Sequence, residues 1–320
     1  MTQRCDLVLE GGGVKGIALV GAISVLEEAG YEFNRIAGTS AGAIVGALVA
    51  AGFTSADLAE LMRDVDYRKF QDEWWLTRIP GGKLISLLTT WGMYRGDYLH
   101  QWLSEILAER GVVTFDDLPP FVDSVDDSDD RRFRLVTMAS DLTLGRLARL
   151  PWDYRPRYGL DPGRQAVADA VRASMSIPFL YRPVRLTDCD GRVSVLVDGG
   201  VLSNFPIDVF DRRGETPRWP TFGLKLSALP GSQTVRFHVR DVMSMARALI
   251  GTMISAHDQM HIDDPSVVAR TIFIDTLGVD ATDFDLDRQT ARRLYDSGRA
   301  AAEKFLARWD WEEYTTTYRT

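Results

Sequence analysis

The chain has 320 residues, of which 45% are hydrophobic and 26% are charged, and its formal net charge at pH 7 is −8. This is the composition of an ordinary globular protein, long enough for one large domain or two small ones. The acidic balance argues against the basic footprint of a nucleic-acid-binding protein, so no nucleic-acid partner is expected. The two cysteines, Cys5 and Cys189, provide neither a disulfide framework nor the spacing of a zinc site.

A cytoplasmic location is expected from the cysteine usage and from the first residues. Residues 1–10 are too short and too charged for the apolar core of a secretory signal. Residues 36–53 carry no charge, but they are rich in Gly, Ala, Ser and Thr, and only their second half is consistently apolar. A helix buried in a soluble core accounts for this segment better than a transmembrane span, so any membrane contact would be peripheral.

The first predicted elements are a short buried strand at 6–9, a helix at 17–29, a strand at 35–37 and a helix from 43. Later elements alternate in the same way, which favours an α/β fold with a largely parallel sheet. They are helices from 54 and from 97, a polar Asp-rich loop at 123–132, strands at 133–139 and 144–150, a helix at 164–173, strands at 182–186, 193–197 and 221–226, a helix at about 239–261, a strand at 270–274 and a helix at 287–307.

Ser40 is the candidate nucleophile of the chain. It is the centre of Gly38-Thr39-Ser40-Ala41-Gly42, which stands between a predicted strand and a predicted helix. Strand, tight turn and helix around Gly-x-Ser-x-Gly form the context of a nucleophile elbow, in which the serine hydroxyl is exposed at the edge of a sheet. Gly38 and Gly42 are expected where the turn brings backbones too close for a Cβ. A glycine-rich turn capped by serine is the alternative for these five residues alone.

A glycine loop follows the first strand, at Gly11-Gly12-Gly13-Val14-Lys15-Gly16. Read literally it matches the Gly-x-Gly-x-x-Gly fingerprint of a dinucleotide site, but the second strand does not end in the acidic residue that would hold the ribose. The competing interpretation is an oxyanion hole, because glycines at a helix start leave backbone N–H groups unpaired. Lys15 would then support the anion or hold the loop in place.

The four histidines offer no clear base for this serine. None lies in a recognisable turn at the end of a predicted strand, and the pair spaced four apart has no third metal ligand. Surface or packing roles account for them: His100, His238, His257 and His261.

Asp198 is the better candidate for the base that a serine nucleophile requires. It closes the apolar strand at 193–197 and is followed by Gly199 and Gly200, which allow a close approach to another backbone. An aspartate has a low reference pKa, about 3.9, so it is a poor base in water, but burial in an apolar cleft would raise that pKa. A plain turn is the alternative for Asp-Gly-Gly taken by itself.

These motifs together resemble the patatin-like phospholipase family. That family carries a Gly-Gly-Gly-x-Arg/Lys-Gly loop, a Gly-x-Ser-x-Gly elbow and an Asp-Gly-Gly/Ala turn, in the order found here at 11–16, 38–42 and 198–200. The segments 173–183 and 204–206 are also similar to the family, and the resemblance spans roughly residues 5–210. Lys15 stands where arginine is commoner, which keeps the charge and loses bidentate geometry.

The resemblance implies a three-layer α/β/α sandwich with a central, mostly parallel sheet, as one domain over 1–320 in which 211–320 completes or extends the fold. It implies a Ser–Asp dyad, with Ser40 as the nucleophile and Asp198 as the proton acceptor. The glycine loop, from Gly11 to Gly16, would form the oxyanion hole through the N–H groups of Gly12 and Gly13. No metal or organic cofactor is needed for this chemistry.

The implied activity is that of a lipid acyl hydrolase acting on carboxylic esters of phospholipids or related acyl lipids through an acyl-enzyme. A lysophospholipase, acylglycerol lipase or thioesterase on the same dyad stays open, as do a dinucleotide-binding oxidoreductase and a non-catalytic interaction module. The tryptophan-bearing stretch 74–94 is a candidate lid or acyl-chain wall that would contact a membrane surface transiently. Simple core packing is the alternative for it.

Overall fold

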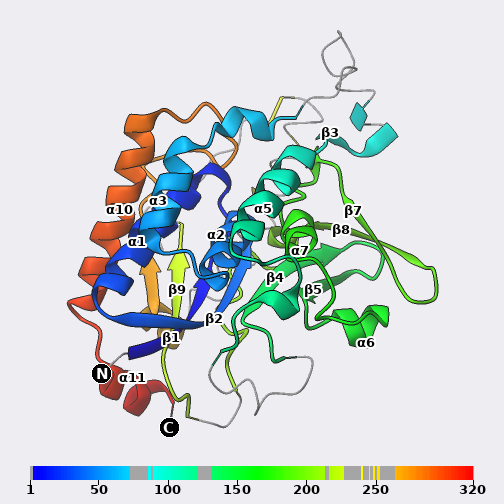
Figure 1. The fold of residues 1–320 in the computed structure, drawn as a ribbon. Helices are drawn as coiled ribbons and strands as arrows, with labels where there is room; N and C mark the ends of the chain where they lie inside the picture. Colours follow the sequence, from blue (N-terminus) through cyan, green and yellow to red (C-terminus); the bar gives the residue numbers. More distant parts are fainter. Residues whose placement is uncertain are drawn as a thin grey trace.

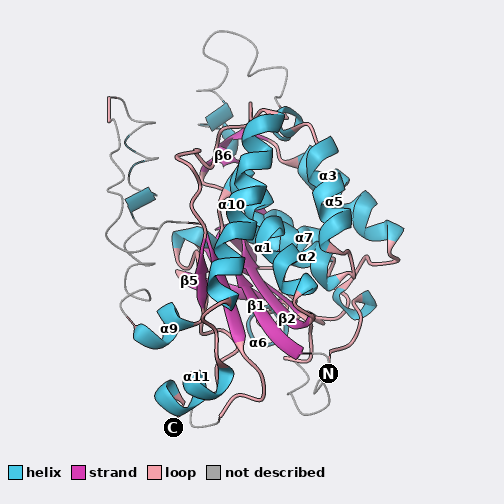
Figure 2. Cartoon of the chain, turned by 90° about the vertical axis from the view of Figure 1, so that its left-hand side faces the viewer, coloured by secondary structure: helices cyan, strands magenta, loops and turns pink. Residues whose placement is uncertain are grey.

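A central sheet organises the protein, and helices flank it (Figures 1 and 2). The predicted α/β class with a mostly parallel sheet is confirmed. The computed structural model describes residues 3–72, 86–87, 89–121, 131–212, 216–226, 239–240, 245, 248, 251–252 and 264–319.

Within these ranges the strands and helices follow the predicted alternation. The strands are β1 (Gln3–Leu9), β2 (Tyr31–Thr39), β3 (Gly92–Tyr94), β4 (Leu135–Asp141), β5 (Arg146–Leu150), β6 (Phe179–Tyr181), β7 (Val184–Thr187), β8 (Val193–Asp198), β9 (Thr221–Lys225) and β10 (Thr271–Phe273). The helices are α1 (Gly16–Glu28), α2 (Ala41–Ala50), α3 (Ser55–Asp64), α5 (Asp97–Glu109), α6 (Tyr154–Tyr158), α7 (Val167–Ser174), α9 (Pro265–Ala269), α10 (Arg288–Leu306) and α11 (Trp311–Tyr318).

The described part of the sheet has strand order β10-β9-β1-β2-β4-β8-β7, with β5 also paired to β4. From β10 to β4 all neighbours are parallel, so the loops after these strands meet at one edge. Strands β5 and β8 both run antiparallel to β4. The sequence pattern did not foresee this antiparallel group, because strand direction is set by long-range pairing rather than by local periodicity.

Strand β4 brings the ends of β2 and β8 together. Its residues 137–141 pair with β5 along one edge. A strand has two hydrogen-bonding edges, so β2 and β8 must share the other one. Thr39, the last residue of β2, pairs with Met138, and Asp198, the last residue of β8, pairs with the next residue, Ala139. The two strands therefore approach from opposite directions and stop head to head.

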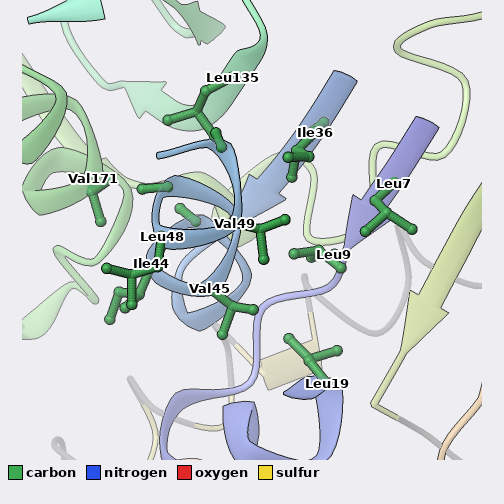
Figure 3. Packing of buried hydrophobic residues seen from close by; sticks show 14 of the residues in the cluster. Leu7, Leu9, Leu19, Ile36, Ile44, Val45, Leu48, Val49, Leu135 and Val171 are labelled. Carbon is green, nitrogen blue, oxygen red and sulfur yellow. The ribbon is translucent and has the colours of Figure 1, made fainter. Parts of the chain in front are cut away.

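Helix α2 fills the centre of the core. Every residue from 41 to 50 is buried, which is the pattern of a helix surrounded by protein on all sides. Its side chains pack between the strands, α1 and α7, as Figure 3 shows for Ile44, Val45 and Leu48. The uncharged segment 36–53 thus divides into a strand end, a turn and this core helix. No helix in the described ranges has the length and apolarity to cross a bilayer.

Several expectations meet the structure only in part. Strand β7 begins at Val184 rather than 182, and the short strands β3 and β6 and the helices α6 and α11 were not predicted. Most of the stretch 74–94, the Asp-rich loop at 123–132 and the helix expected at 239–261 lie outside the described residues.

The C-terminal part of the chain joins the same sheet and core. Strands β9 and β10 extend the sheet beyond β1, and α10 packs along α1. Two glycines permit this close helix contact. A Cβ on Gly21 would lie 2.0 Å from the carbonyl oxygen of Tyr295, and a Cβ on Gly298 would lie 1.9 Å from that of Ala18.

We expect Gly298→Ala to destabilise the protein. In an ordinary helix interior this change stabilises by about 1 kcal/mol, but here the added methyl meets a backbone atom that cannot move cheaply, so a net loss of roughly 1–3 kcal/mol is expected. Urea unfolding measures it. Asp296→Ala, at an exposed position of the same helix, is the control and should change little. A Gly298→Ala variant as stable as the parent would contradict the inferred contact.

Candidate active site

Ser40 occupies a strained turn between β2 and α2. Its φ of 53° and ψ of −124° place a non-glycine residue where L-amino acids are rarely found. The flanking glycines are needed for space. A Cβ on Gly38 would lie 2.2 Å from the carbonyl oxygen of Gly42, and one on Gly42 would lie 2.3 Å from that of Leu9. This is the geometry that the elbow interpretation predicts for Gly-x-Ser-x-Gly.

The end of α7 holds the serine in this turn. The Ser40 N–H donates to Oγ of Ser174 at 2.9 Å, and the Ser40 hydroxyl is 3.5 Å from Sδ of Met175. A thioether is a weak acceptor, so the hydroxyl proton is only loosely engaged. The strained backbone is thus stabilised by a side chain that lies 134 residues away in the sequence.

Asp198 lies beside Ser40 because of the strand junction on β4. Its Oδ1 accepts the N–H of Gly200 at 2.7 Å, and its own N–H donates to the Ser176 carbonyl at 2.9 Å. Its Oδ2 is buried and has no hydrogen-bond partner among the described residues. Gly199 is required here, since a Cβ would lie 2.3 Å from the Met138 carbonyl oxygen.

Burial changes the pKa of the Asp198 carboxyl. Desolvation raises its pKa to about 7, and the hydrogen bond from the Gly200 N–H and the proximity of the Ser40 hydroxyl lower it in part. A carboxylate with a pKa near 7 can hold or release a proton at neutral pH. The unpartnered Oδ2 is the atom available to take that proton.

The glycine loop lies against Ser40. A Cβ on Gly11 would lie 3.1 Å from Cβ of Ser40. The Gly11 N–H already has a hydrogen-bond partner, because it donates to the Asn204 carbonyl at 3.2 Å. The N–H groups of Gly12 and Gly13 donate to no other described residue, and Gly13 has a positive φ of 57° that suits glycine. Two N–H donors without a partner among the described residues therefore lie at the start of the short helix that leads into α1.

A later segment covers the outer side of this loop. The Val14 N–H donates to the Ala281 carbonyl at 3.1 Å, and a Cβ on Gly13 would lie 1.8 Å from that same oxygen. A dinucleotide would need its pyrophosphate to approach these N–H groups. The contact with Ala281 counts against that interpretation.

A buried polar network holds the glycine loop in place. Glu10 accepts hydrogen bonds from the Lys225 ammonium and from the Leu226 N–H, and Nδ2 of Asn204 is 3.4 Å from Oε1 of Glu10 and 3.3 Å from the Gly11 carbonyl. These contacts hold the loop at Glu10, which precedes its first glycine, and at the carbonyl of that glycine, Gly11.

Lys15 lies close to the same network. Burial lowers the pKa of its ammonium, and the Glu10 and Asp280 carboxylates raise it. Of the two roles considered for Lys15, this placement between carboxylates favours holding the loop in place. Gly16 makes only ordinary contacts, since a Cβ there would lie 3.4 Å from Cβ of Ala41, its nearest neighbour.

An apolar cleft opens beside the elbow. Residues from the glycine loop, α2, α3, α5 and the segment after α7 line it, and nearly all of the lining is hydrophobic. The lining includes Gly13, Val14, Ala41, Ile44, Met62, Val65, Tyr67, Phe70, Trp102, Met175, Ile177, Tyr181, Ala281 and Phe284. Such a surface excludes water and suits a hydrocarbon chain.

The histidines do not complete the site within the described residues. His100 is the one that the structure describes, and its Nε2 pairs with Asp169 at 2.7 Å on an exposed surface. His238, His257 and His261 lie outside the described ranges.

Sequence reasoning missed the residues that position the site. Ser174 and Ser176 bond to the two candidate catalytic residues, and Arg172 holds Ser176 through a 2.6 Å hydrogen bond. Asn204 and Glu10 hold the glycine loop. The signal for most of them was the similarity of 173–183 and 204–206 to the family, which marked the segments without giving a role to any side chain.

Comparisons with known proteins agree with these motifs. The family model described as patatin-like phospholipase matches residues 7–211. The uncharacterized protein YqhO of Bacillus subtilis is 39% identical over 306 residues, which cover 95% of this chain and 98% of that protein. An uncharacterized NTE family protein of Mycobacterium bovis is 32% identical over 215 residues, which cover 67% of this chain and 29% of that longer protein.

Among solved structures, VipD from Legionella pneumophila is similar in fold. The TM-score is 0.54 at 19% sequence identity, and the match covers 96% of this chain and 67% of that one.

We expect Asp198→Asn to stabilise the protein above pH 7. Because the folded pKa is raised, ionisation favours the unfolded chain, so stability falls as the pH rises from about 4 to about 7. Asparagine cannot ionise and still accepts the Gly200 N–H. The gain at pH 8 should be on the order of 1–4 kcal/mol and should vanish near pH 4.

Urea unfolding at the two pH values measures this difference. Asp296→Asn, which alters an exposed carboxyl on α10, is the control and should give no such gain. Equal stability of Asp198→Asn and the parent at pH 8 would contradict the buried, unpaired state of this carboxyl.

Proposed function

Because the chain belongs to the patatin-like phospholipase family, we propose that it cleaves carboxylic esters of acyl lipids through a dyad of Ser40 and Asp198. The observation that carries this proposal is the junction on β4, where β2 and β8 end head to head. It sets the serine beside a buried carboxyl whose Oδ2 has no other hydrogen-bond partner among the residues described.

The first half of the proposed cycle is acylation. Ser40 Oγ attacks the ester carbonyl as its proton passes to Asp198 Oδ2. The N–H groups of Gly12 and Gly13 stabilise the oxygen that becomes negative, and one such donor is worth about 3 kcal/mol. The tetrahedral intermediate collapses, the C–O bond to the alcohol breaks, and the leaving oxygen takes the proton from Asp198.

The second half is hydrolysis of the acyl-enzyme. Water attacks the acyl carbon and gives a proton to Asp198, which passes it to Ser40 Oγ as the acid leaves. Each half returns Asp198 to the carboxylate, so one group with a pKa near 7 serves as base and then as acid. The long contact between Ser40 and Met175 is consistent with a resting hydroxyl that reorients when substrate binds.

The apolar cleft supports an acyl lipid as the substrate. It begins at the glycine loop and Ala41, next to Ser40, so the chain of an acyl group bound at the serine can extend into it. Two aromatic side chains nearby are exposed, Trp91 at 49% and Phe179 at 39%. Trp91 directly precedes Gly92, which pairs with Phe179. Exposed aromatic rings beside an apolar cleft suit transient contact with a membrane surface.

We expect Ser40→Ala to abolish the release of fatty acid from phospholipid vesicles and from short p-nitrophenyl esters. The loss should be at least about a thousandfold, because no other described side chain occupies the elbow. A fluorophosphonate probe should label the parent protein and not this variant. Asp198→Asn should lose activity to a similar degree while it remains folded.

The pH dependence of the reaction rate tests the proposed role of Asp198. The rate should rise with pH through about 7, because Asp198 must be ionised to accept the proton. Unlabelled, inactive parent protein would identify a non-catalytic interaction module. Full activity of Ser40→Ala would place the chemistry elsewhere.

We expect Val65→Trp to shorten the preferred acyl chain. Val65 lines the cleft and is half-buried, so a larger ring there fills space that a long chain would occupy. The ratio of kcat/KM for long over short p-nitrophenyl esters should fall by roughly tenfold or more. Asp64→Trp, at the exposed neighbouring position, is the control. An unchanged ratio would show that the acyl chain binds elsewhere.

A further inference from the structure

Positive backbone φ angles single out three apolar residues. Among the described residues other than glycine, four have a positive φ, and one of them is the candidate nucleophile Ser40. The others are Trp91 at 59°, Phe179 at 67° and Leu277 at 56°. This left-handed conformation strains residues with bulky side chains, whereas nine described glycines adopt it elsewhere without that cost. Strain of this kind is concentrated at functional sites.

Core packing does not account for these three side chains. Trp91 is 49% exposed, Phe179 is 39% exposed and Leu277 is 38% exposed. A single exposed apolar residue is ordinary on a protein surface. Here exposure coincides with strain at each of the three positions, so a role outside the folded core is expected for them.

Phe179 and Trp91 lie beside the apolar cleft. Phe179 stands between Ile177 and Tyr181 in the sequence, and both of these residues line the cleft. Trp91 directly precedes Gly92, which pairs with Phe179. The two exposed aromatic side chains therefore belong to one short pair of strands, β3 and β6, at the edge of the cleft.

Leu277 belongs to the segment between β10 and α10, which reaches the same cleft. Ala281 and Phe284 of this segment line the cleft, and the Ala281 carbonyl accepts the Val14 N–H next to the glycine loop. Figure 1 shows β3 and the start of α10 at the same, upper end of the molecule. The three strained apolar residues thus border the cleft from distant parts of the chain.

The buried side chain of Arg172 holds β3 and β6 in place. Its guanidinium donates to the carbonyls of Gly96 and Arg182, each at 3.0 Å, and these residues follow the two strands. The strands also approach closely, since a Cβ on Gly92 would lie 2.4 Å from the Arg182 backbone nitrogen. The aromatic side chains are therefore presented on a fixed backbone, which needs little further ordering when a partner binds.

Charges of both signs lie next to these side chains. The exposed Arg185 places its guanidinium over the Trp91 ring, 5.7 Å from the centroid. The exposed Asp275 accepts the Leu277 N–H through Oδ1 at 2.8 Å. A zwitterionic head group offers a phosphate to the first and an ammonium to the second. A strongly anionic surface offers no such match, and the formal net charge of the chain is −8.

We propose that Trp91, Phe179 and Leu277 form a contact rim that inserts into the interface of a zwitterionic phospholipid bilayer beside the cleft. The inference rests on the proposed function, because it names the surface from which the acyl lipid enters the cleft. Tryptophan suits the level of the head groups, and the phenylalanine and leucine side chains gain burial among the acyl chains. Glycine would relieve the strain at these positions and could not provide that burial.

Co-sedimentation with vesicles tests the contact rim on the full chain carrying Ser40→Ala, so that the proposed hydrolysis does not alter the lipid. The probes are phosphatidylcholine vesicles with and without phosphatidylglycerol. The rim variant also carries Trp91→Gly, Phe179→Gly and Leu277→Gly. We expect its binding to phosphatidylcholine to fall by roughly tenfold or more. Its melting temperature should be no lower than that of the parent, because glycine relieves the strained φ.

The matched control carries Val113→Ala, Val193→Ala and Tyr318→Ala. These residues are 59%, 44% and 38% exposed, and none adjoins a residue that lines the cleft. Binding by this control should stay within about twofold of the parent. If the glycine variant melts at a lower temperature, asparagine at the three rim positions repeats the comparison, because asparagine tolerates a positive φ.

The proposal is overturned if the folded parent does not bind phosphatidylcholine vesicles, if the rim and control variants bind them equally, or if binding requires phosphatidylglycerol. An oligomeric parent and a monomeric rim variant with equal vesicle binding would instead assign the contact rim to an interface between copies. None of these outcomes depends on hydrolysis, whereas an inactive protein with Ser40 intact would contradict the proposed function alone.

Discussion

The head-to-head ending of β2 and β8 along one edge of β4 is the constraint on which the candidate site depends. In a continuous parallel sheet, a single neighbouring strand would occupy that whole edge of β4. The ends of two strands, and with them Ser40 and Asp198, could then not meet along it. Because β8 runs antiparallel, its last residue meets the last residue of β2 at adjacent positions of β4. Gly199 follows from this crowding, since a Cβ there would lie against the Met138 carbonyl, whereas Gly38 and Gly42 are required by the tight turn at Ser40 and by its contact with β1.

The same junction lowers the stability of the folded protein. A buried carboxyl with an unpaired oxygen and a serine at positive φ both favour the unfolded chain. The surroundings offset this cost with hydrogen bonds from the end of α7 and with the fully buried helix α2. Strain and desolvation thus occur together at the one place where the proposed chemistry needs a reactive hydroxyl and a base of near-neutral pKa.

The sequence predicted the parts of this site that are local and left out those that are not. Ser40 and Asp198 stand in short glycine-bearing turns at strand ends, and such turns have a residue pattern that can be read directly. Ser174, Ser176 and Asn204 act through single hydrogen bonds across long sequence distances, and a serine or asparagine with that role looks like any other. The direction of β8 likewise depends on its pairing with β4, so hydrophobic periodicity predicted the strand but not its antiparallel course.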